Sequence, residues 1–375
     1  MPLIKNELWI AGPGSGKSYK LVETALKFPD KKILLTTFTN SNTEVLKNLF
    51  YEQNNCIPPN VTIDSWWAIL LKHGVKPFQG VMTDNEIQGT HLVNSTSSTI
   101  MKNGKVVGNI AEANTREYFF DNNYKIYTDK IALAVVRCNE KTNGLVMERL
   151  SLLFDFVMID EAQDLVGYDL EIIRLLLLSE SDIILAADPR QVTFQTHHSG
   201  KYKKYQQGKI KDFINDYFKN GEVQVDTKSL KDSRRCNDDI CKLASQIYPE
   251  YPIIKSQFNT LSNHHNGIFY IHQNEVSTYL EDHNGVQLRN SIKTPTNPNF
   301  SVYNFGEAKG MTFDHVLIYP TKDIVDWIKS KDCEILAEET RAKFFVAVTR
   351  ARYSVAFVLP DDKYVAEGQM GLGFK

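Results

Sequence analysis

Residues 155–164 read Asp-Phe-Val-Met-Ile-Asp-Glu-Ala-Gln-Asp, an apolar run that ends in carboxylates and one amide. The run has the composition of a buried strand in a parallel sheet. Its end would bring Asp160 and Glu161 to the carboxyl edge of that sheet, where open α/β folds bind ligands. Two acids are useful there only if a cation or a reacting water needs them. The stretch therefore predicts a phosphate site elsewhere in the chain.

A glycine-rich turn at 11–18, Ala-Gly-Pro-Gly-Ser-Gly-Lys-Ser, supplies that site. It lies between an apolar run ending at Ile10 and a helix-compatible stretch. Glycines let backbone N–H groups approach phosphate oxygens, and the following helix adds its partial positive charge. This context favours a phosphate loop over a chance glycine-rich turn. The residues expected to bind the nucleotide are Gly12, Pro13, Gly14, Ser15, Gly16, Lys17 and Ser18.

The acid cluster then has defined roles. Lys17 would reach the terminal phosphates, and Ser18 and Asp160 would hold Mg²⁺. Glu161 would orient and deprotonate the attacking water. The alternative is a strand end with solvated acids, which the phosphate loop disfavours. One strand later, Gln191 follows another apolar run, and its carboxamide is placed to sense a γ-phosphate.

Strand-length apolar runs recur along the chain, each followed by a helix-compatible stretch. This alternation predicts an α/β fold with parallel sheets. The pattern breaks at 71–143, which suggests an insertion in the first domain, and at 199–221, a lysine-containing stretch expected to connect two domains. The expected strands are 8–10, 33–38, 61–63, 154–159, 183–187, 221–225, 268–272, 300–305, 313–319 and 353–359.

Composition sets outer bounds on function. A chain of 375 residues can hold two domains. Its formal net charge of −2 gives no overall basic signature of a nucleic-acid binder, although a groove can be locally basic. Five cysteines without a Cys-x-x-Cys pair, and no signal peptide or long apolar run, indicate a reducing, cytoplasmic setting with free thiols. An Asn- and Lys-rich composition suggests a bacterial, phage or mobile-element origin.

Taken in order, the motifs resemble a superfamily 1 DNA helicase of the UvrD/Rep type. The most specific matches are Asp-Glu-Ala-Gln-Asp at 160–164 and Val-Ala-Val-Thr-Arg-Ala-Arg at 346–352. The chain between Arg235 and Asn304 is too short for the large insertion of long family members, so the resemblance is to a compact member. The matching segments are 11–18, 37–44, 62–65, 160–164, 188–191, 230–236, 307–314 and 346–352.

This resemblance implies two RecA-like P-loop NTPase domains, 1–220 with the insertion and 221–375, with an ATP cleft between them. By position, Arg235 and Arg350 match the arginines that reach the γ-phosphate from the second domain, although Arg234 leaves the register of the first open. Such cations stabilise charge in the transition state of phosphoryl transfer. Gln163 and Gly310 are also assigned to the nucleotide.

The resemblance also implies single-stranded DNA lying across the tops of both domains. Aromatic rings stack bases without sequence preference. Trp66 and Trp67 are further stacking candidates, but they are as readily explained as core residues. Lysines at 201, 203 and 204 form either a phosphate track or a solvated loop. The residues assigned to the strand are Phe38, Asn40, Ser65 and Phe194.

The leading functional hypothesis is an ATP- and Mg²⁺-dependent translocase or helicase acting 3′ to 5′ on single-stranded DNA, with RNA as an alternative strand. Its expected setting is DNA repair or replication, with a nuclease, replication or defence protein as partner and no membrane. The alternative is an ATPase switch or sensor subunit of a nuclease or antiviral complex, with little unwinding of its own. A small-molecule kinase is disfavoured by the motifs at 160–164 and 346–352.

Overall fold

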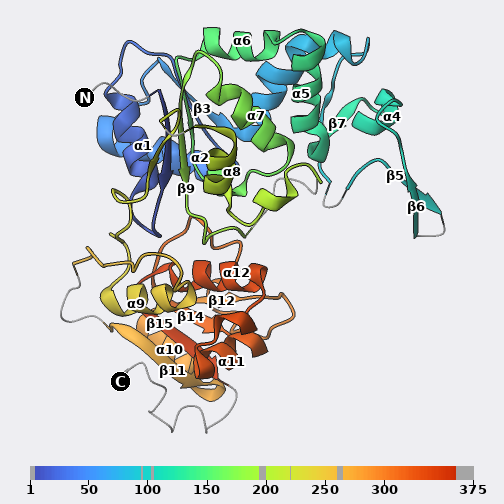
Figure 1. Ribbon diagram of the computed structural model, residues 1–375. Helices are drawn as coiled ribbons and strands as arrows, with labels where there is room; N and C mark the ends of the chain where they lie inside the picture. Colours follow the sequence, from blue (N-terminus) through green and yellow to red (C-terminus); the bar gives the residue numbers. More distant parts are fainter. Residues whose placement is uncertain are drawn as a thin grey trace. The chain divides into compact units, whose positions relative to one another are not determined.

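The computed structural model describes residues 5–93, 96–102, 105–193, 200–219, 221–259 and 265–359. The chain forms two compact units, in which segments distant in sequence come together (Figure 1). The first unit consists of Met1–Trp9, Ser18–Ala187 and Gln195–Asp226. The second consists of Ile10–Lys17, Asp188–Phe194 and Thr227–Lys375.

The first unit is built on a six-stranded sheet in the order β10-β1-β9-β8-β2-β3. The pairs β1–β10, β2–β3, β2–β8 and β8–β9 are parallel. Every residue of β2 and β8 is buried, as expected for central strands covered on both faces. The strands are β1 (Asn6–Ile10), β2 (Ile33–Thr37), β3 (Val61–Ser65), β8 (Phe156–Ile159), β9 (Asp182–Ala187) and β10 (Gln224–Asp226). The helices around the sheet include α1 (Lys17–Leu26), α2 (Asn40–Asn54), α6 (Leu145–Leu153) and α7 (Tyr168–Leu177).

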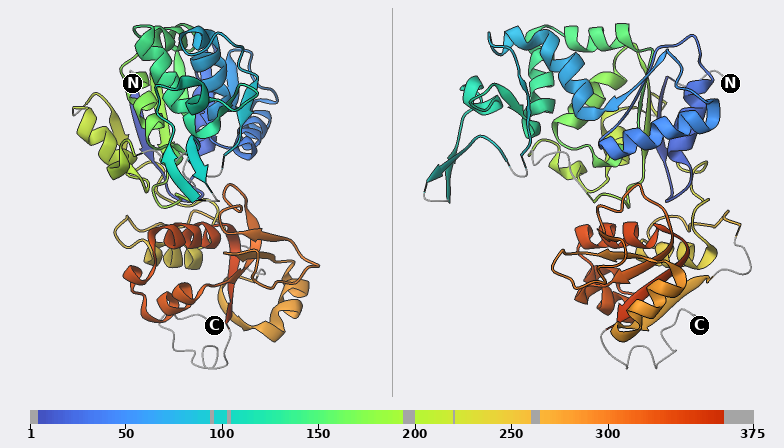
Figure 2. Two further views of the ribbon diagram at one scale, coloured as in Figure 1. Left: turned by 90° about the vertical axis from the view of Figure 1, so that its right-hand side faces the viewer. Right: turned by 180° about the vertical axis from the view of Figure 1, so that it is seen from behind.

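The region expected to be an irregular insertion, 71–143, contains more regular structure than its sequence indicates. The hairpin of β5 and β6 extends away from the sheet of its own unit (Figure 2). By contrast, α5 (Ile131–Lys141) is a core helix whose apolar residues are almost all buried. The other elements here are α3 (Trp66–Ile69), η1 (Leu70–Val75), η2 (Lys76–Val81), β4 (Gly89–His91), β5 (Thr99–Lys102), β6 (Lys105–Asn109), α4 (Thr115–Phe119), β7 (Lys125–Tyr127) and η3 (Thr128–Lys130).

The stretch 199–221 is not a simple connection. Its described part forms η5 (Lys203–Tyr205) and α8 (Ile210–Tyr217), both within the first unit. Tyr205 and Phe213 are buried, and their rings meet edge to face with centroids 5.2 Å apart. Apolar burial of this kind fixes the segment onto the unit rather than leaving it as a linker.

The second unit is built on a five-stranded parallel sheet in the order β11-β15-β14-β12-β13. One face packs on Trp327, Phe344 and Phe345, and the other on Val276 and Leu280. The strands are β11 (Gly267–His272), β12 (Val286–Arg289), β13 (Val302–Asn304), β14 (Phe313–Tyr319) and β15 (Ala351–Leu359). The helical segments are α9 (Asp238–Ile247), η6 (Gln273–Glu275), α10 (Val276–His283), α11 (Lys322–Ser330), η7 (Cys333–Ile335) and α12 (Glu338–Val348).

The α/β class with parallel sheets, predicted from the alternation of strand and helix, is confirmed. One central strand, β12, was not predicted, because its fully buried Gln287 interrupts the apolar pattern. That amide is satisfied inside the unit, where it donates to the Asn297 carbonyl over 2.8 Å and accepts from the Tyr319 hydroxyl over 2.8 Å. In the described part of the chain, no helix is both long and apolar enough to cross a membrane.

Candidate nucleotide site

The carboxyl end of β8 carries the acid cluster of the first unit. The Ser18 hydroxyl, at the start of α1, donates to Asp160 Oδ2 over 2.5 Å. Asp160 is 3% exposed, and its other carboxylate oxygen accepts from the Glu161 N–H over 2.9 Å. The structure thus brings together the two residues assigned to Mg²⁺. A hydroxyl and a carboxylate are suitable ligands for this ion, which takes its remaining ligands from phosphates and water.

Glu161 is constrained in both its backbone and its side chain. It has φ 57° and ψ 36°, the left-handed region, and it precedes η4 (Ala162–Asp164). Such a conformation costs about 1–3 kcal/mol for a non-glycine residue and is often found at functional sites. Its buried carboxylate accepts a hydrogen bond from Gln163 Nε2. Gln163, assigned to the nucleotide from the sequence, therefore contacts the candidate base and orients it.

The phosphate loop depends on its glycines. Gly14 and Gly16 have φ 64° and 87°, conformations that glycine adopts without steric cost. The N–H of Gly12 donates to the Leu230 carbonyl over 2.5 Å, and a Cβ at Gly12 would collide with the next carbonyl. Ser15 is 3% exposed, and its hydroxyl has no hydrogen-bond partner among the described residues. An orphaned buried hydroxyl in a glycine-rich loop is suited to an incoming phosphate oxygen.

Gln191 and Arg350, both in the second unit, are directly bonded although they are far apart in sequence. Arg350 Nη2 donates to Gln191 Oε1 over 3.1 Å. Arg350 is 2% exposed, and its other donors reach the carbonyls of Val346 and Met311. Gln191 is also buried, and its amide donates to Asp188 Oδ2 over 2.7 Å. The buried guanidinium is thus bonded to the Gln191 side chain and to two backbone carbonyls of its own unit.

Arg235 approaches the same region of the second unit. Its Nη1 donates to the Thr349 carbonyl over 3.3 Å, while Arg234 is exposed. This contact favours Arg235 as the arginine of the pair at 234–235 that belongs to the site. Its Cβ also lies only 2.6 Å from where a Cβ on Gly14 would stand, so the phosphate loop and this segment are in close contact.

Two cations of this network were not assigned from the sequence. Lys309 Nζ donates to the Gln191 carbonyl over 2.9 Å, next to Gly310, which has φ 86°. Arg190 is 5% exposed and donates to Asp188 Oδ1 over 2.8 Å and to the Ala11 carbonyl over 2.9 Å. Arg190 therefore ties the start of the phosphate loop to the segment after β9. The sequence signal for Arg190 is its place in Asp188-Pro189-Arg190-Gln191, directly before the glutamine predicted to sense the γ-phosphate.

The residues assigned to the strand lie at the carboxyl edge of the first sheet, where Thr37 of β2 pairs with Ser65 of β3. Phe38 is half-buried and packs edge-on against Trp67, with ring centroids 4.9 Å apart. Asn40 is exposed at the start of α2. These side chains share one edge, as a strand path requires. Phe194, the fourth residue assigned to the strand, lies outside the described residues.

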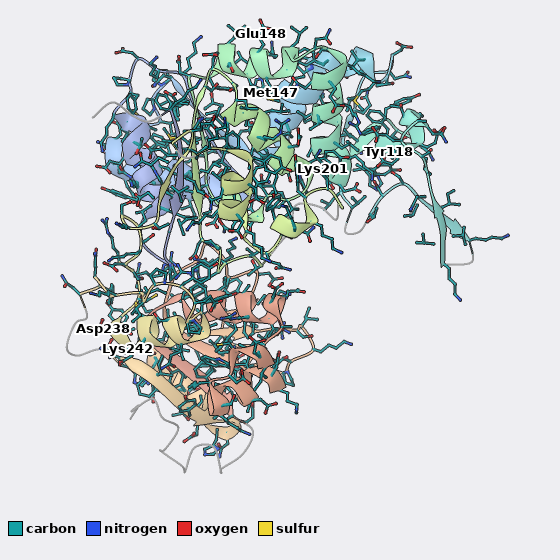
Figure 3. The ribbon with its side chains drawn as sticks, in the orientation of Figure 1. Tyr118, Met147, Glu148, Lys201, Asp238 and Lys242 are labelled. Carbon is teal, nitrogen blue, oxygen red and sulfur yellow. The ribbon has the colours of Figure 1, made fainter. Side chains whose placement is uncertain are left out.

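Other candidates for the strand have partners within the first unit. Trp66 is 1% exposed and donates from its indole to Asp169 Oδ1 over 2.7 Å, so it is a core residue. Lys201 Nζ, labelled in Figure 3, lies 3.4 Å from a Glu171 carboxylate oxygen, and Lys204 Nζ lies 2.9 Å from Asp216. Two of the three lysines, Lys201 and Lys204, are therefore engaged in ion pairs within their own unit.

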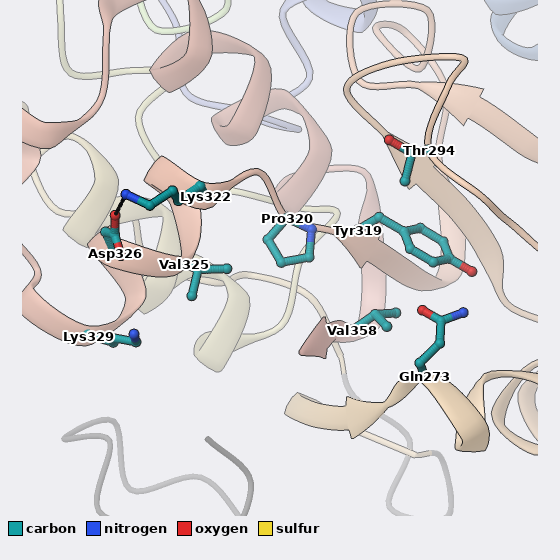
Figure 4. A pocket seen from close by; sticks show the side chains of 9 residues that line it. All are labelled: Gln273, Thr294, Tyr319, Pro320, Lys322, Val325, Asp326, Lys329 and Val358. Atoms are coloured by element: carbon teal, nitrogen blue, oxygen red, sulfur yellow. Dashed lines mark hydrogen bonds and ion pairs between the residues drawn. The ribbon is translucent and has the colours of Figure 1, made fainter. Parts of the chain in front are cut away.

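A separate cavity of about 420 Å³ opens near the carboxyl ends of β14 and β15 in the second unit (Figure 4). None of the residues assigned to the nucleotide lines it. At its rim, Lys322 Nζ pairs with Asp326 Oδ2 over 3.3 Å. Its walls are formed by Gln273, Thr294, Tyr319, Pro320, Lys322, Val325, Asp326, Lys329 and Val358.

Comparison with solved structures finds likenesses among viral helicases. The structure of PRRSV helicase is similar at 15% identity and a TM-score of 0.45, with 95% of this chain and 53% of that chain covered. Arterivirus nonstructural protein 10 (helicase) is similar at 14% identity and a TM-score of 0.45, with 98% of this chain and 61% of that chain covered. Its complex with DNA is similar at the same identity and TM-score, with 98% of this chain and 63% of that chain covered. The chain thus spans between about half and two thirds of these proteins. No curated protein sequence matches it.

Comparison with protein families gives one match, to the viral superfamily 1 RNA helicase core domain over residues 128–359, more than half of the chain. The matched region begins after the phosphate loop and contains the acid cluster, the Gln191–Arg350 network and the whole second sheet. The superfamily predicted from the motifs is confirmed, while the matching family is viral. The chain belongs to the viral superfamily 1 RNA helicase core domain family.

Proposed function

We propose that this chain is an ATP-driven motor that translocates along a single nucleic-acid strand and separates duplexes. One observation carries the proposal: the hydrogen bond of 2.5 Å between Ser18 and Asp160, with Glu161 next in the chain. It joins the last residue of a phosphate loop to an acid cluster, an arrangement that NTP hydrolysis requires. ATP is the nucleotide that the UvrD/Rep resemblance implies.

The chemistry follows from the roles that the side chains can fill. The loop N–H groups and Lys17 would bind the phosphates, and Ser18 and Asp160 would hold Mg²⁺. The bound ion would neutralise charge on the phosphate oxygens. Glu161, oriented by Gln163, would take a proton from the attacking water. Arg235 and Arg350 would stabilise the charge that develops on the transferred phosphoryl group.

The strand would follow the carboxyl edge of the first sheet, over Phe38, Asn40 and Ser65. Stacking on an aromatic ring contributes about 1–3 kcal/mol per base and tolerates any sequence. Single-stranded DNA moving 3′ to 5′ is the substrate and direction that the UvrD/Rep resemblance implies. The family match names RNA helicases, so an RNA strand belongs in the test.

The test is ATP turnover by the full chain, measured without a strand and with single-stranded DNA or RNA of the same length. The proposal expects strong stimulation by one strand and loss of turnover in Lys17→Ala. It also expects Phe38→Ala and Asn40→Ala to weaken stimulation without changing turnover in the absence of a strand. Tyr51→Ala, at an exposed aromatic residue of α2, is the matched control.

Two results would count against the motor. Turnover that neither strand stimulates would favour the ATPase switch or sensor subunit, activated by a protein partner. Stimulation that survives both Phe38→Ala and Asn40→Ala would place the strand elsewhere. The direction of movement would be measured with strands that carry a bound blocking protein at the 3′ or the 5′ end, by asking which block the motor displaces.

A further inference from the structure

The outer face of α6 carries two exposed leucines although the helix belongs to a folded unit. Leu145 and Leu152 are 48% and 73% exposed, while Val146, Met147 and Leu150 between them are buried. Figure 3 shows Glu148 on the outer side of the helix and Met147 on the side toward the rest of the unit. Exposed apolar stripes of this kind often mark protein contacts.

This face also lines a groove. Phe78, from η2, and Leu153 line it together with the outer side chains of α6, and its volume is about 310 Å³. Arg149 lies in its wall, and the Nε of this residue is buried without a hydrogen-bond partner in the described structure. A buried donor without an acceptor is destabilising. The groove therefore offers apolar side chains beside one acidic residue, Glu148, and one basic residue, Arg149.

The order of side chains on this face is self-complementary. Leu145, Glu148, Arg149 and Leu152 fall at i, i+3, i+4 and i+7, on one side of a helix. These four outer positions, although not the whole helix, are symmetric about the midpoint of Glu148 and Arg149, apart from an exchange of charge. An antiparallel copy of the helix would place leucine opposite leucine and glutamate opposite arginine. Two-fold interfaces require this self-complementarity.

We propose that α6 is a self-association surface, which pairs antiparallel with α6 of a second copy of this chain. Leu145 would pack against Leu152 of the second copy, and Glu148 would form an ion pair with Arg149 of the second copy. Both contacts occur twice in a symmetric pair. The pairing is independent of nucleotide hydrolysis and of the proposed motor.

The size of the surface sets the expected strength. A helix of nine residues is about 13–14 Å long, so a pair of them buries less than the roughly 1,200–2,000 Å² of a stable interface. The dimer is therefore weak and forms reversibly as protein concentration rises. Sedimentation velocity of the full chain over a concentration series should show a monomer–dimer equilibrium.

Leucine substitution gives the first test. Leu152→Lys should raise the dimer dissociation constant at least about tenfold, because it puts two lysines opposite leucines. Leu92→Lys is the matched control, since Leu92 is 69% exposed on the same unit and does not line the groove. A chain that stays monomeric throughout the series would overturn the proposal and would indicate that the groove binds a different protein. A dimer whose dissociation constant Leu152→Lys does not change would also overturn the proposal.

Charge exchange gives the second test. Glu148→Arg and Arg149→Glu should each weaken the dimer at least about tenfold, because each puts like charges opposite one another. The double variant should restore most of the affinity, because it rebuilds both pairs with the charges exchanged. This recovery of affinity also shows that the weaker binding of the single variants does not come from unfolding. Single variants without effect, or a double variant as weak as the singles, would contradict the pairing.

Discussion

At the scale of single residues, Glu161 combines a left-handed backbone, a buried carboxylate and a hydrogen bond from Gln163. A carboxylate held in this way is prepared to accept a proton from water. Glu161→Gln keeps the size and the polar character of the side chain but removes the base. We expect it to bind ATP as the original chain does and to lose about 10²–10⁴-fold in turnover. Turnover and fluorescent-nucleotide titration measure the two quantities separately.

The control for that substitution is Glu180→Gln, whose side chain is 93% exposed. It makes the same chemical change at a solvated position, and turnover should not respond. Wild-type turnover in Glu161→Gln would show that another group takes the proton.

Arg350 provides a second prediction at this scale. A lysine at this position keeps the charge but cannot reproduce a planar group bonded to Gln191, Val346 and Met311 together. We expect Arg350→Lys to lower turnover by about 10³-fold or more, as loss of an arginine finger does. The affinity for ATP should change little, because the charge is needed mainly in the transition state. Arg352→Lys, at a half-exposed arginine two residues later, should keep turnover.

The sequence could predict the residues of the site better than their contacts. Ser18, Asp160 and Glu161 follow from strand ends and from motifs with known spacing. The bond between Gln191 and Arg350 could not be predicted, because it joins positions 159 residues apart. Arg190 was overlooked for a related reason: its role rests on a contact with the Ala11 carbonyl at the other end of the site, which local sequence does not reveal.

At the scale of elements, three imidazoles meet in the second unit, from His265 two residues before β11, from α10 and from β14. The His265 ring stacks between Phe269 and His283, with centroids 3.8 and 3.9 Å away, and His315 is 6.0 Å away. Burial, together with the charges of His283 and His315, lowers the pKa of His265 to about 4. The folded unit therefore disfavours a proton on His265 that the unfolded chain accepts near pH 6.5.

The sign of the effect on stability follows from proton binding. Between about pH 4 and 6.5, the unfolded chain binds more protons than the folded one, so the free energy of unfolding rises with pH. We expect the thermal midpoint of the second unit to fall as pH is lowered from about 7 to about 5. His265→Asn should make this dependence shallower. Calorimetry over a pH series measures both, and equal slopes in the two proteins would rule out His265 as the cause.

Elements were predictable where apolar runs were continuous. The strands at 33–38, 183–187 and 313–319 were placed within a residue or so, because both faces of each are covered. The buried Gln287 concealed β12, and the polar surroundings of α5 concealed a core helix. In both cases tertiary contacts satisfy groups whose local pattern suggests a loop.

At the scale of the whole molecule, charge limits how a strand can be held. The chain has a formal net charge of −2, and the side chains assigned to the strand at the edge of the first sheet, Phe38, Asn40 and Ser65, are neutral. Lys201 and Lys204, which could have tracked phosphates, pair with Glu171 and Asp216. Binding should therefore depend on stacking and hydrogen bonds more than on neutralised phosphates.

Because few cations contact the strand, its binding affinity should depend only weakly on salt concentration. For single strands, the slope of log affinity against log salt is about −0.7 for each phosphate contacted by a cation. We expect a slope shallower than about −2, corresponding to three or fewer such contacts. Fluorescence anisotropy of a labelled strand over a salt series measures it. Lys201→Gln together with Lys204→Gln should leave the slope unchanged, because their ammonium groups are already paired within the first unit. A steep slope that these substitutions flatten would show instead that the lysines leave their carboxylates to bind the strand.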